Sequence, residues 1–397
     1  MYRVPVLSKD GKPLMQTKAS RARRWLKEGK AVIYKNDLHF FAIQLTVDSG
    51  EETQPVAVGI DPGKHYSGIG LQSSKATLFT AHLELPFQKV KDRMETRAMM
   101  RRGRRSRRIN RKLPFDQRAH RQKRFDNRRG HKLAPSIKAN RQLEYRVVKE
   151  LSQLFPISSI IYEIVKARGD KGFSPVMVSQ KVMTEQWLPS IAFVTNKLGW
   201  ETSARREVLR LEKDRQKSNQ TPTTHAVDGV ALASHEFLKY KCLKGDKGWF
   251  EGSVKITNAP FSVIKRPPVS RRQLHLMQPA KGGVRRKYGG TVTRHGFRKG
   301  DYVETERKGV QSRGWVSGDT KTQISVSNFD WKRLGQFSAK KTQLLKRSTN
   351  LIVNTFNGGR AFLRGCRLDA ATQERSDEEV RISPDVYTPR LPLTLRV

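Results

Sequence analysis

The sequence predicts a mixed α/β fold built around one central sheet. Three strand patterns follow one another at residues 56–61, 66–72 and 77–85, and the short turns PGKH and SSKA between them indicate an antiparallel meander. A helical pattern at 140–155, with one apolar face, leads into an isoleucine-rich strand at 157–165. That density of apolar residues is typical of a central, buried strand.

Composition limits the class of protein. At 397 residues the chain is long enough for two or three domains, and 36% hydrophobic residues suffice for at least one core. Its 79 Lys and Arg against 36 Asp and Glu give a formal net charge of +43, which exceeds what solubility needs and predicts nucleic acid as the partner. A membrane-surface protein is the alternative, but no apolar run approaches the roughly 18 residues of a spanning helix.

Cysteine usage and the first residues bear on the compartment. The two cysteines, Cys242 and Cys366, form no CxxC pair, which opposes a disulfide framework and a cysteine-built zinc site. The opening MYRVPVLSKDGK lacks the apolar core of a signal peptide. We therefore expect a cytoplasmic, reduced environment.

Smaller units are predicted on both sides of the central sheet. Residues 1–47 combine short strand patterns with the basic helix SRARRWLKEGK, which ends at Gly29, and the polar stretch 48–54 is the expected linker. Beyond Tyr240, short strands and loops predict a compact, basic, β-rich domain of the small-barrel kind, with interleaved aromatic residues at Trp315, Phe329, Trp331 and Phe337.

Residues 91–132 form a strongly basic run, with 18 Lys and Arg against 4 Asp and Glu. Such a run can be a merely solvated face. Arginine dominates here, however, and its planar fork suits phosphate recognition. We expect nucleic-acid contacts from Arg97, Arg101, Arg102, Arg104, Arg105, Arg107, Arg108 and Arg111, and from Arg285 and Arg286 in the later basic stretch KGGVRRKYGG.

Three acids and one histidine are the candidate catalytic residues. Asp61 ends the first strand pattern, and Glu163 stands inside an apolar strand that has little structural use for a charge. His225 and Asp228 lie three residues apart on one face of a helix predicted at 224–240. Taken alone, this pair is also explained by Asp228 complementing the helix dipole beside an incidental histidine.

Together these parts have the order of a ribonuclease H-like fold, in which central strands and a late helix bring carboxylates to one edge. Clustered carboxylates repel and stay ionised only beside cations. Two Mg²⁺ ions, or Mn²⁺, held by Asp61, Glu163, Asp228 and His225 would clamp the attacking and leaving oxygens of a phosphoryl displacement. Asp61 is the expected bridging ligand, and His225 is expected to orient or deprotonate water.

These motifs resemble those of a known family. GIDPGKHYSGIG, the glutamate of IIYEIV, and HAVDGVALA are similar to the three split motifs of RuvC-type nucleases, and the arginine-rich stretch resembles the bridge helix of the transposon-encoded IscB and IsrB proteins. GKPLMQTKASRARRWLKEGKAVIY resembles the PLMP domain of that group, with Gln16 in place of proline. RKGDYVETE through FSAKK resembles its C-terminal region.

One departure from IscB points to a subgroup. IscB proteins carry an HNH nuclease between the second and third RuvC motifs, whereas residues 164–224 contain no histidine and no cysteine. The resemblance is therefore to IsrB, the HNH-lacking form of the OMEGA systems. It implies a prokaryotic, cytoplasmic, RNA-guided and Mg²⁺-dependent endonuclease that nicks the non-target strand beside a short target-adjacent motif.

The resemblance also implies partners and domain boundaries. The implied partners are a guide (omega) RNA and double-stranded target DNA, and no membrane is involved. The protein is expected to be monomeric and to associate with the nucleoid when it binds DNA. The expected parts are a PLMP-like domain (1–53), RuvC motif I (54–90), the bridge helix (91–135), RuvC motifs II and III without an HNH insertion (136–240) and a β-rich C-terminal region (241–397). The C-terminal region is expected to contact the guide RNA and the target-adjacent motif. A guide-independent RuvC-like junction resolvase and a non-catalytic RNA-binding protein remain alternatives.

Overall fold

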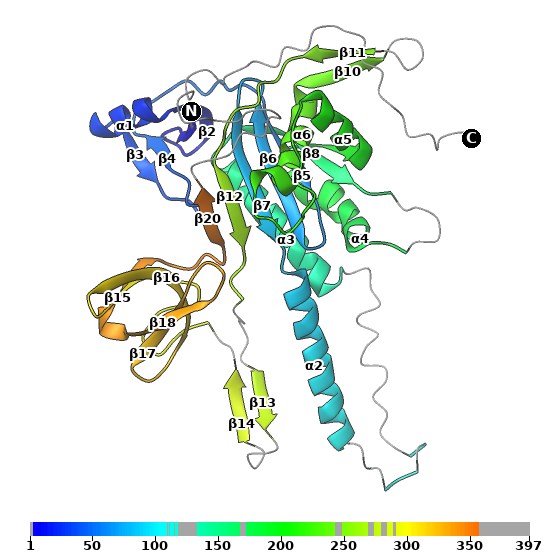
Figure 1. Cartoon of the computed structure of the whole chain (residues 1–397), viewed down its shortest axis with the longest axis vertical. Coiled ribbons are helices and arrows are strands. Elements are labelled where there is room, and N and C mark those ends of the chain that lie inside the picture. Colours follow the sequence, from blue (N-terminus) through cyan, green and yellow to red (C-terminus); the bar gives the residue numbers. More distant parts are fainter. Residues whose placement is uncertain are drawn as a thin grey trace. The chain divides into compact units, whose positions relative to one another are not determined.

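Figure 1 shows the fold of the chain in a computed structural model. The structure describes residues 3–108, 110, 112–114, 116–117, 133–166, 172–242, 248–268, 274–278, 284–288 and 291–356. The described residues form two compact units. The first contains the residues up to 263 together with 355 and 356, and the second contains residues 264–354.

The first unit begins with a four-stranded sheet in the order β2-β1-β4-β3. Its helix α1 (Ala19–Lys27) buries Ala22 against the sheet, and Gly29 follows the helix in the left-handed conformation, with φ of +71°. The strands and the helix predicted for this region are confirmed. The strands are β1 (Arg3–Leu7), β2 (Pro13–Lys18), β3 (Ala31–Tyr34) and β4 (Ala42–Leu45).

A seven-stranded sheet in the order β20-β12-β7-β6-β5-β8-β9 forms the centre of the fold. β5, β6 and β7 are the predicted antiparallel meander, and β8 and β9 add to β5 in parallel. The five strands from β7 to β9 therefore have the chain order 3-2-1-4-5, which is the order of a ribonuclease H-like sheet. The bounds are β5 (Val56–Asp61), β6 (Tyr66–Ser73), β7 (Thr77–Glu84), β8 (Ile157–Ile164), β9 (Phe193–Leu198), β12 (Phe261–Lys265) and β20 (Ile352–Phe356).

Helix α6 (Val227–Ala233) lies directly on this sheet because glycines leave room for it. A Cβ atom added to Gly59 of β5 would lie 2.0 Å from the Gly229 carbonyl oxygen, and one added to Gly68 of β6 would lie 1.8 Å from the carbonyl oxygen of His225. Real Cβ atoms do not approach so closely, so a larger residue would push the helix away. The glycines of GIDPGKHYSGIG thus set the distance between α6 and the strands.

Helix α3 (Pro135–Ser152) contacts the opposite face of the sheet, and α2 (Phe87–Arg108) is the basic helix that precedes it. The predicted apolar face of α3 is confirmed, because its apolar residues are fully buried: Leu143, Val147, Val148, Leu151 and, just beyond the helix, Leu154. Two further helices, α4 (Pro175–Val182) and α5 (Gly199–Val208), stand before and after β9.

The prediction of one helix over 224–240 is wrong at its carboxyl end. A π-helical turn at Pro222–Ala226 leads into α6, a 3-10 turn follows at Ser234–Glu236, and residues from Leu238 belong to strand β10 (Leu238–Cys242). Leu238 is buried in a cluster with residues of α6, and β10 pairs with β11 (Gly248–Gly252). Strand pairing therefore replaces the last helical turn, which a helical sequence pattern alone does not reveal.

His235, beyond α6, predicts acid sensitivity of the fold. Its Nδ1 lies 3.1 Å from Nη2 of Arg205, and burial together with this cation lowers the pKa of His235 to about 2. In the unfolded chain this histidine has a pKa of about 6.5 and takes up a proton below that pH, whereas the folded protein keeps it neutral. The free energy of unfolding is therefore highest above pH 6.5 and falls as the pH decreases. We expect the protein to lose about 2 kcal/mol between pH 7 and pH 5 from this residue. His235→Gln should flatten that part of the profile, measured by denaturant unfolding, and an unchanged slope would contradict this account.

The second unit contains a five-stranded antiparallel sheet in the order β18-β17-β16-β15-β19. Its core consists of Val303, Val316, Ile324, Val326 and Phe337. Strands make up most of the regular structure described beyond Tyr240, and residues 357–397, with Cys366, lie outside the described part. The boundaries 241–397 of one C-terminal region stay a prediction. The strands of this sheet are β15 (Tyr302–Arg307), β16 (Val310–Asp319), β17 (Gln323–Ser327), β18 (Arg333–Ser338) and β19 (Thr342–Lys346). A separate two-stranded sheet consists of β13 (Leu274–Gln278) and β14 (Val284–Tyr288).

No helix in the described part of the chain has the length and apolar character needed to cross a membrane.

Candidate active site

Asp61 and Glu163 are brought together by the pairing of their strands. Ile60 of β5 pairs with Tyr162 of β8 in parallel register, so Asp61 and Glu163 are the next residues on two adjacent strands. Neighbouring strands lie about 4.8 Å apart, and residues at equivalent positions project from the same face. Two carboxylates therefore stand side by side at the carboxyl end of these strands.

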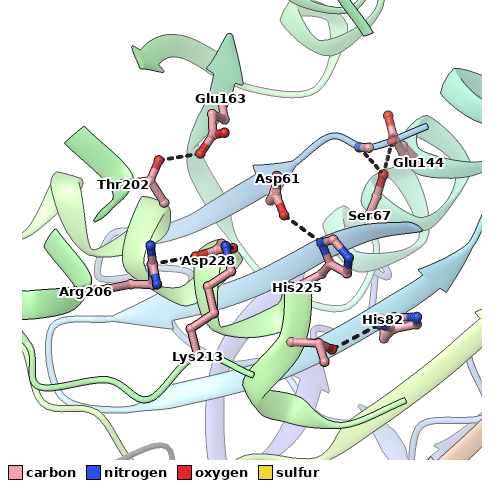
Figure 2. A network of polar contacts seen from close by, with 12 residues as sticks. Asp61, Ser67, His82, Glu144, Glu163, Thr202, Arg206, Lys213, His225 and Asp228 are labelled. Carbon is pink, nitrogen blue, oxygen red and sulfur yellow. Dashed lines mark hydrogen bonds and ion pairs between the residues drawn. The ribbon is translucent and has the colours of Figure 1, made fainter. Parts of the chain in front are cut away.

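The π-helical turn and α6 bring the other two candidates to the same place. Nδ1 of His225 lies 2.9 Å from Oδ2 of Asp61, at hydrogen-bonding distance (Figure 2). The close approach at Gly68 holds the His225 backbone against β6 and makes this contact geometrically available. Nε2 of His225 is buried and has no hydrogen-bond partner among the described residues.

Asp228 is held by two cations that the sequence did not single out. Its Oδ2 accepts a hydrogen bond of 2.5 Å from Nζ of Lys213, and its Oδ1 lies 2.7 Å from Nε of Arg206 (Figure 2). Asp228 is 2% exposed, so this carboxylate requires compensation of its charge. Arg206 and Lys213 lie on α5 and in the segment after it.

Glu163 is paired with a neutral partner. Thr202 of α5 donates a hydrogen bond of 2.5 Å from its hydroxyl to Oε2 of Glu163. Thr202 is another site residue that the sequence did not indicate, because a threonine in a helix carries no distinctive signal.

The acids of the site act on one another electrostatically. Burial and the negative charge of Asp61 raise the pKa of Glu163 to about 7, and Asp228 adds to this while Thr202 opposes it. Burial and Asp61 also raise the pKa of Asp228, whereas Lys213 and Arg206 lower it. The three carboxylates thus influence one another electrostatically, while Lys213 and Arg206 offset the charge of Asp228.

This donor set fits a hard divalent cation in its chemistry. Carboxylate oxygens are the preferred ligands of Mg²⁺, an imidazole nitrogen is accepted by Mn²⁺, and the buried Nε2 of His225 has no partner among the described residues. As the side chains stand, no three His, Cys, Asp or Glu residues in the described part of the chain form a group that could hold a metal ion. Lys213 and Arg206 instead supply the positive charge beside the Asp228 carboxylate.

Lys213 therefore provides a test of the charge balance in the site. In the presence of a chelator, Lys213→Met should reduce the free energy of unfolding by about 2 kcal/mol, because Asp228 loses a charge-assisted hydrogen bond. Millimolar Mg²⁺ should close this gap, since a bound cation would compensate Asp228 instead. The measurement is denaturant unfolding with EDTA and with Mg²⁺, and Lys181→Met, which removes an exposed lysine, is the control. An equal loss under both conditions would contradict the interpretation.

A second histidine, His82 of β7, lies next to His225. The sequence does not indicate it. His82 of β7 is fully buried, its Nδ1 lies 3.2 Å from Oγ1 of Thr224, and its ring centroid is 5.6 Å from that of His225 (Figure 2). Burial and the neighbouring His225 lower the pKa of His82 to about 4, so the ring is neutral at pH 7. A histidine inside a strand pattern carries no functional signal in the sequence.

The predicted nucleic-acid contacts fall on α2 and on the second unit. Arg97 is half-buried on α2, and Arg101 and Arg102 are exposed. The structure traces α2 to Arg108, but the side chains of Arg104, Arg105, Arg107 and Arg108 lie outside the part it describes, as does Arg111. Arg285 and Arg286 belong to β14, and their side chains likewise lie outside the described part. Their contacts with nucleic acid stay predictions.

Comparisons with known proteins give a matching family model and similar solved structures. A family model described as RRXRR protein matches residues 4–173, and the sequence RRGRR at 101–105 has the pattern of that description. A T. thermophilus RuvC structure in complex with Holliday junction substrate is similar, with 11% identity and a TM-score of 0.26 over 45% of this chain and 90% of that chain. A second Thermus thermophilus RuvC structure has 13% identity and a TM-score of 0.25 with the same coverage.

No curated protein matches the chain. The fold of the central sheet is defined by its strand order and by the close packing of α6 on its glycines, and not by these overall similarities.

Proposed function

We propose that the chain is an RNA-guided, Mg²⁺-dependent endonuclease that nicks the non-target strand of duplex DNA beside a short target-adjacent motif. The observation that supports the proposal is that β5 and β8 place Asp61 beside Glu163, with His225 2.9 Å from Asp61 and Asp228 near enough to raise the pKa of Glu163. These residues come from sequence positions far apart, and their mutual charge repulsion is a cost that a purely structural site would have no reason to maintain.

Each residue has a role in this proposal. Asp61, Glu163 and Asp228 would hold the Mg²⁺ ions, and His225 would complete the set. When bound, the ions supply an activated water and stabilise the charge that develops on the phosphate. His225 would orient or deprotonate that water, and its contact with Asp61 fixes the imidazole in one orientation.

The basic helix α2 and the second unit are the proposed binding elements for the guide RNA. Beyond Phe87 at its start, α2 buries none of the side chains that the structure describes, and it carries the RRGRR pattern. The helix therefore suits a solvent-accessible row of guanidinium groups, which match RNA phosphates. Base pairing by a bound RNA would then supply sequence specificity, while the second unit would contact the guide and the target-adjacent motif, as guided effectors divide these tasks.

The test of guide dependence is the RNA that copurifies with the protein. We expect RNA of defined length with one constant and one variable part, and changing the variable part should redirect nicking to the matching DNA. Cleavage of branched DNA without RNA would instead support a junction resolvase. Bound RNA without cleavage of any DNA in Mg²⁺ or Mn²⁺ would support a non-catalytic RNA-binding protein.

A further inference from the structure

A buried ion pair on α3 contacts the turn that follows Asp61. Arg141 and Glu144, one helical turn apart, are 1% and 0% exposed, and Nη1 of Arg141 lies 2.9 Å from Oε2 of Glu144. Burying two charges costs several kcal/mol per ion, and apolar residues of similar volume are often equally stabilising in such a place. The pair therefore calls for an explanation other than stability.

Both members of the pair bind the β5–β6 turn. Nη2 of Arg141 donates a hydrogen bond of 2.6 Å to the carbonyl oxygen of Gly63. Ser67 donates from its hydroxyl to Glu144 and accepts, at 3.0 Å, from the backbone N–H of Gly63 (Figure 2). The turn is thus held at both polar groups of Gly63. No other residue fits at that position, because a Cβ atom there would lie 1.8 Å from the carbonyl oxygen of Tyr66.

Asn140, the residue before Arg141, adds a third contact with the turn. Its side-chain nitrogen donates a hydrogen bond of 2.8 Å to the carbonyl oxygen of Lys64. Asn140 is itself 1% exposed. The beginning of α3 therefore holds two successive carbonyl groups of the chain directly after Asp61 and Pro62.

The same arginine reaches the strand that carries the second acid. Nη1 of Arg141 donates a hydrogen bond of 3.0 Å to the hydroxyl of Tyr162, which is fully buried and immediately precedes Glu163 on β8. Successive strand residues point to opposite faces, so Tyr162 contacts α3 behind the sheet while Glu163 stands on the face covered by α6. One guanidinium thereby connects the backbone two residues after Asp61 to the residue next to Glu163.

We propose that Arg141 and Glu144 are positioning residues that set the distance between Asp61 and Glu163 from behind the sheet. Arg141 fixes the turn and β8 together, and Glu144 with Ser67 keeps the guanidinium and the turn in one arrangement. The pair touches no substrate. Its effect on catalysis passes entirely through the two carboxylates, and its relevance to metal binding rests on the proposed function.

The deciding variant removes both charges at once, because removing one would leave the other buried and unpaired. Arg141→Met/Glu144→Leu should still fold, because apolar residues replace both charges together, although the unpaired Tyr162 hydroxyl and Gly63 carbonyl lower its thermal stability. Amide exchange in the peptide 58–70 should become at least about tenfold faster, since the turn loses its anchors. Mn²⁺ affinity, followed by electron paramagnetic resonance, should fall about 10- to 100-fold, the usual effect of removing a partner that orients a ligand.

A control on the same helix separates positioning from general loss of an ion pair. Arg146 and Glu150, 2.9 Å apart, form another ion pair on α3, and Arg146 also binds Asp37 of the N-terminal region. Arg146→Met/Glu150→Leu should leave both the exchange of peptide 58–70 and Mn²⁺ affinity unchanged. Should the first double variant fail to fold, Ser67→Ala and Tyr162→Phe each remove a single hydroxyl. Ser67→Ala should speed exchange in the turn, and Tyr162→Phe should lower Mn²⁺ affinity.

Three outcomes have distinct meanings. Wild-type exchange and Mn²⁺ affinity in Arg141→Met/Glu144→Leu would overturn the proposal. Equally faster exchange in all peptides would also overturn it, since the pair would then be an ordinary stabilising contact. If the wild-type protein binds no Mn²⁺, the proposed function fails, and the exchange of peptide 58–70 alone still decides whether the pair anchors the turn.

Discussion

Replacing Asp61 by alanine is expected to lower the rate of DNA nicking in Mg²⁺ by at least about a thousandfold while RNA binding is unchanged. Asp61 is the acid that contacts His225 and whose charge raises the pKa of both Glu163 and Asp228. Removing it would take away a proposed metal ligand. Metal catalysis contributes several kcal/mol, and each 1.4 kcal/mol is about a factor of ten in rate.

The matched control for Asp61→Ala is an acid outside the site. Glu185 lies in the segment after α4, 3.8 Å from Lys181, with a side chain that is 58% exposed. Glu185→Ala should nick like the wild type. The measurement is single-turnover cleavage of a supercoiled plasmid, together with RNA affinity by filter binding. Full nicking by Asp61→Ala would place the reaction elsewhere in the molecule.

The second large effect concerns α2. Replacing Arg101, Arg102, Arg104 and Arg105 with alanine should weaken RNA binding by several orders of magnitude at low salt. It should also reduce the slope of log affinity against log salt by about one unit for each phosphate that the variant no longer neutralises. The physical reason is counterion release, to which every neutralised phosphate contributes. The thermal stability should change little, because Arg101 and Arg102 are exposed.

The control for α2 removes lysines from other exposed places of the first unit. Lys75 lies in the turn between β6 and β7, and Lys181 has a side chain that is 77% exposed. Lys75→Ala/Lys181→Ala should leave the salt slope unchanged. If the α2 variant keeps the wild-type slope, the arginine run is a solvated face and the guide binds elsewhere on the protein.

The sequence predicted those parts of the fold in which local pattern and tertiary environment agree. The meander at 56–85 is bounded by clear turn signals, and Glu163 stands out because a carboxylate inside an apolar strand is costly without a function. The glycines of β5 and β6 were visible as well, although their use, the close approach of α6, depends on packing between segments that lie far apart in the chain.

The partners of the acids could not be predicted, for a different physical reason. Lys213 and Arg206 belong to a sequence rich in charges, where nothing marks which cation reaches Asp228. Arg141 and Glu144 appear in the helical pattern as ordinary polar residues beside the apolar face. They are buried because the β5–β6 turn packs over this part of α3, a tertiary interaction that the local pattern of α3 does not encode.

The proposed strand preference follows from having one candidate centre. The interval between Glu163 and His225 contains no histidine that could serve as the general base of an HNH centre. Its acids include Glu185 and Glu201, which lie 3.8 and 2.8 Å from Lys181 and Lys197 in ion pairs of residues four apart in the chain. A guided complex with one nuclease centre should therefore cut one strand of the opened duplex.

The most direct test is cleavage of a supercoiled plasmid that carries the matched target and its flanking motif. The plasmid is incubated with protein, guide RNA and Mg²⁺, and the products are resolved over time at low enzyme concentration. We predict open-circle DNA, with the nick on the strand that does not pair with the guide, and no product with EDTA. Linear DNA as the primary product, or nicking that continues in EDTA, would contradict a single metal-dependent centre built from Asp61, Glu163, Asp228 and His225.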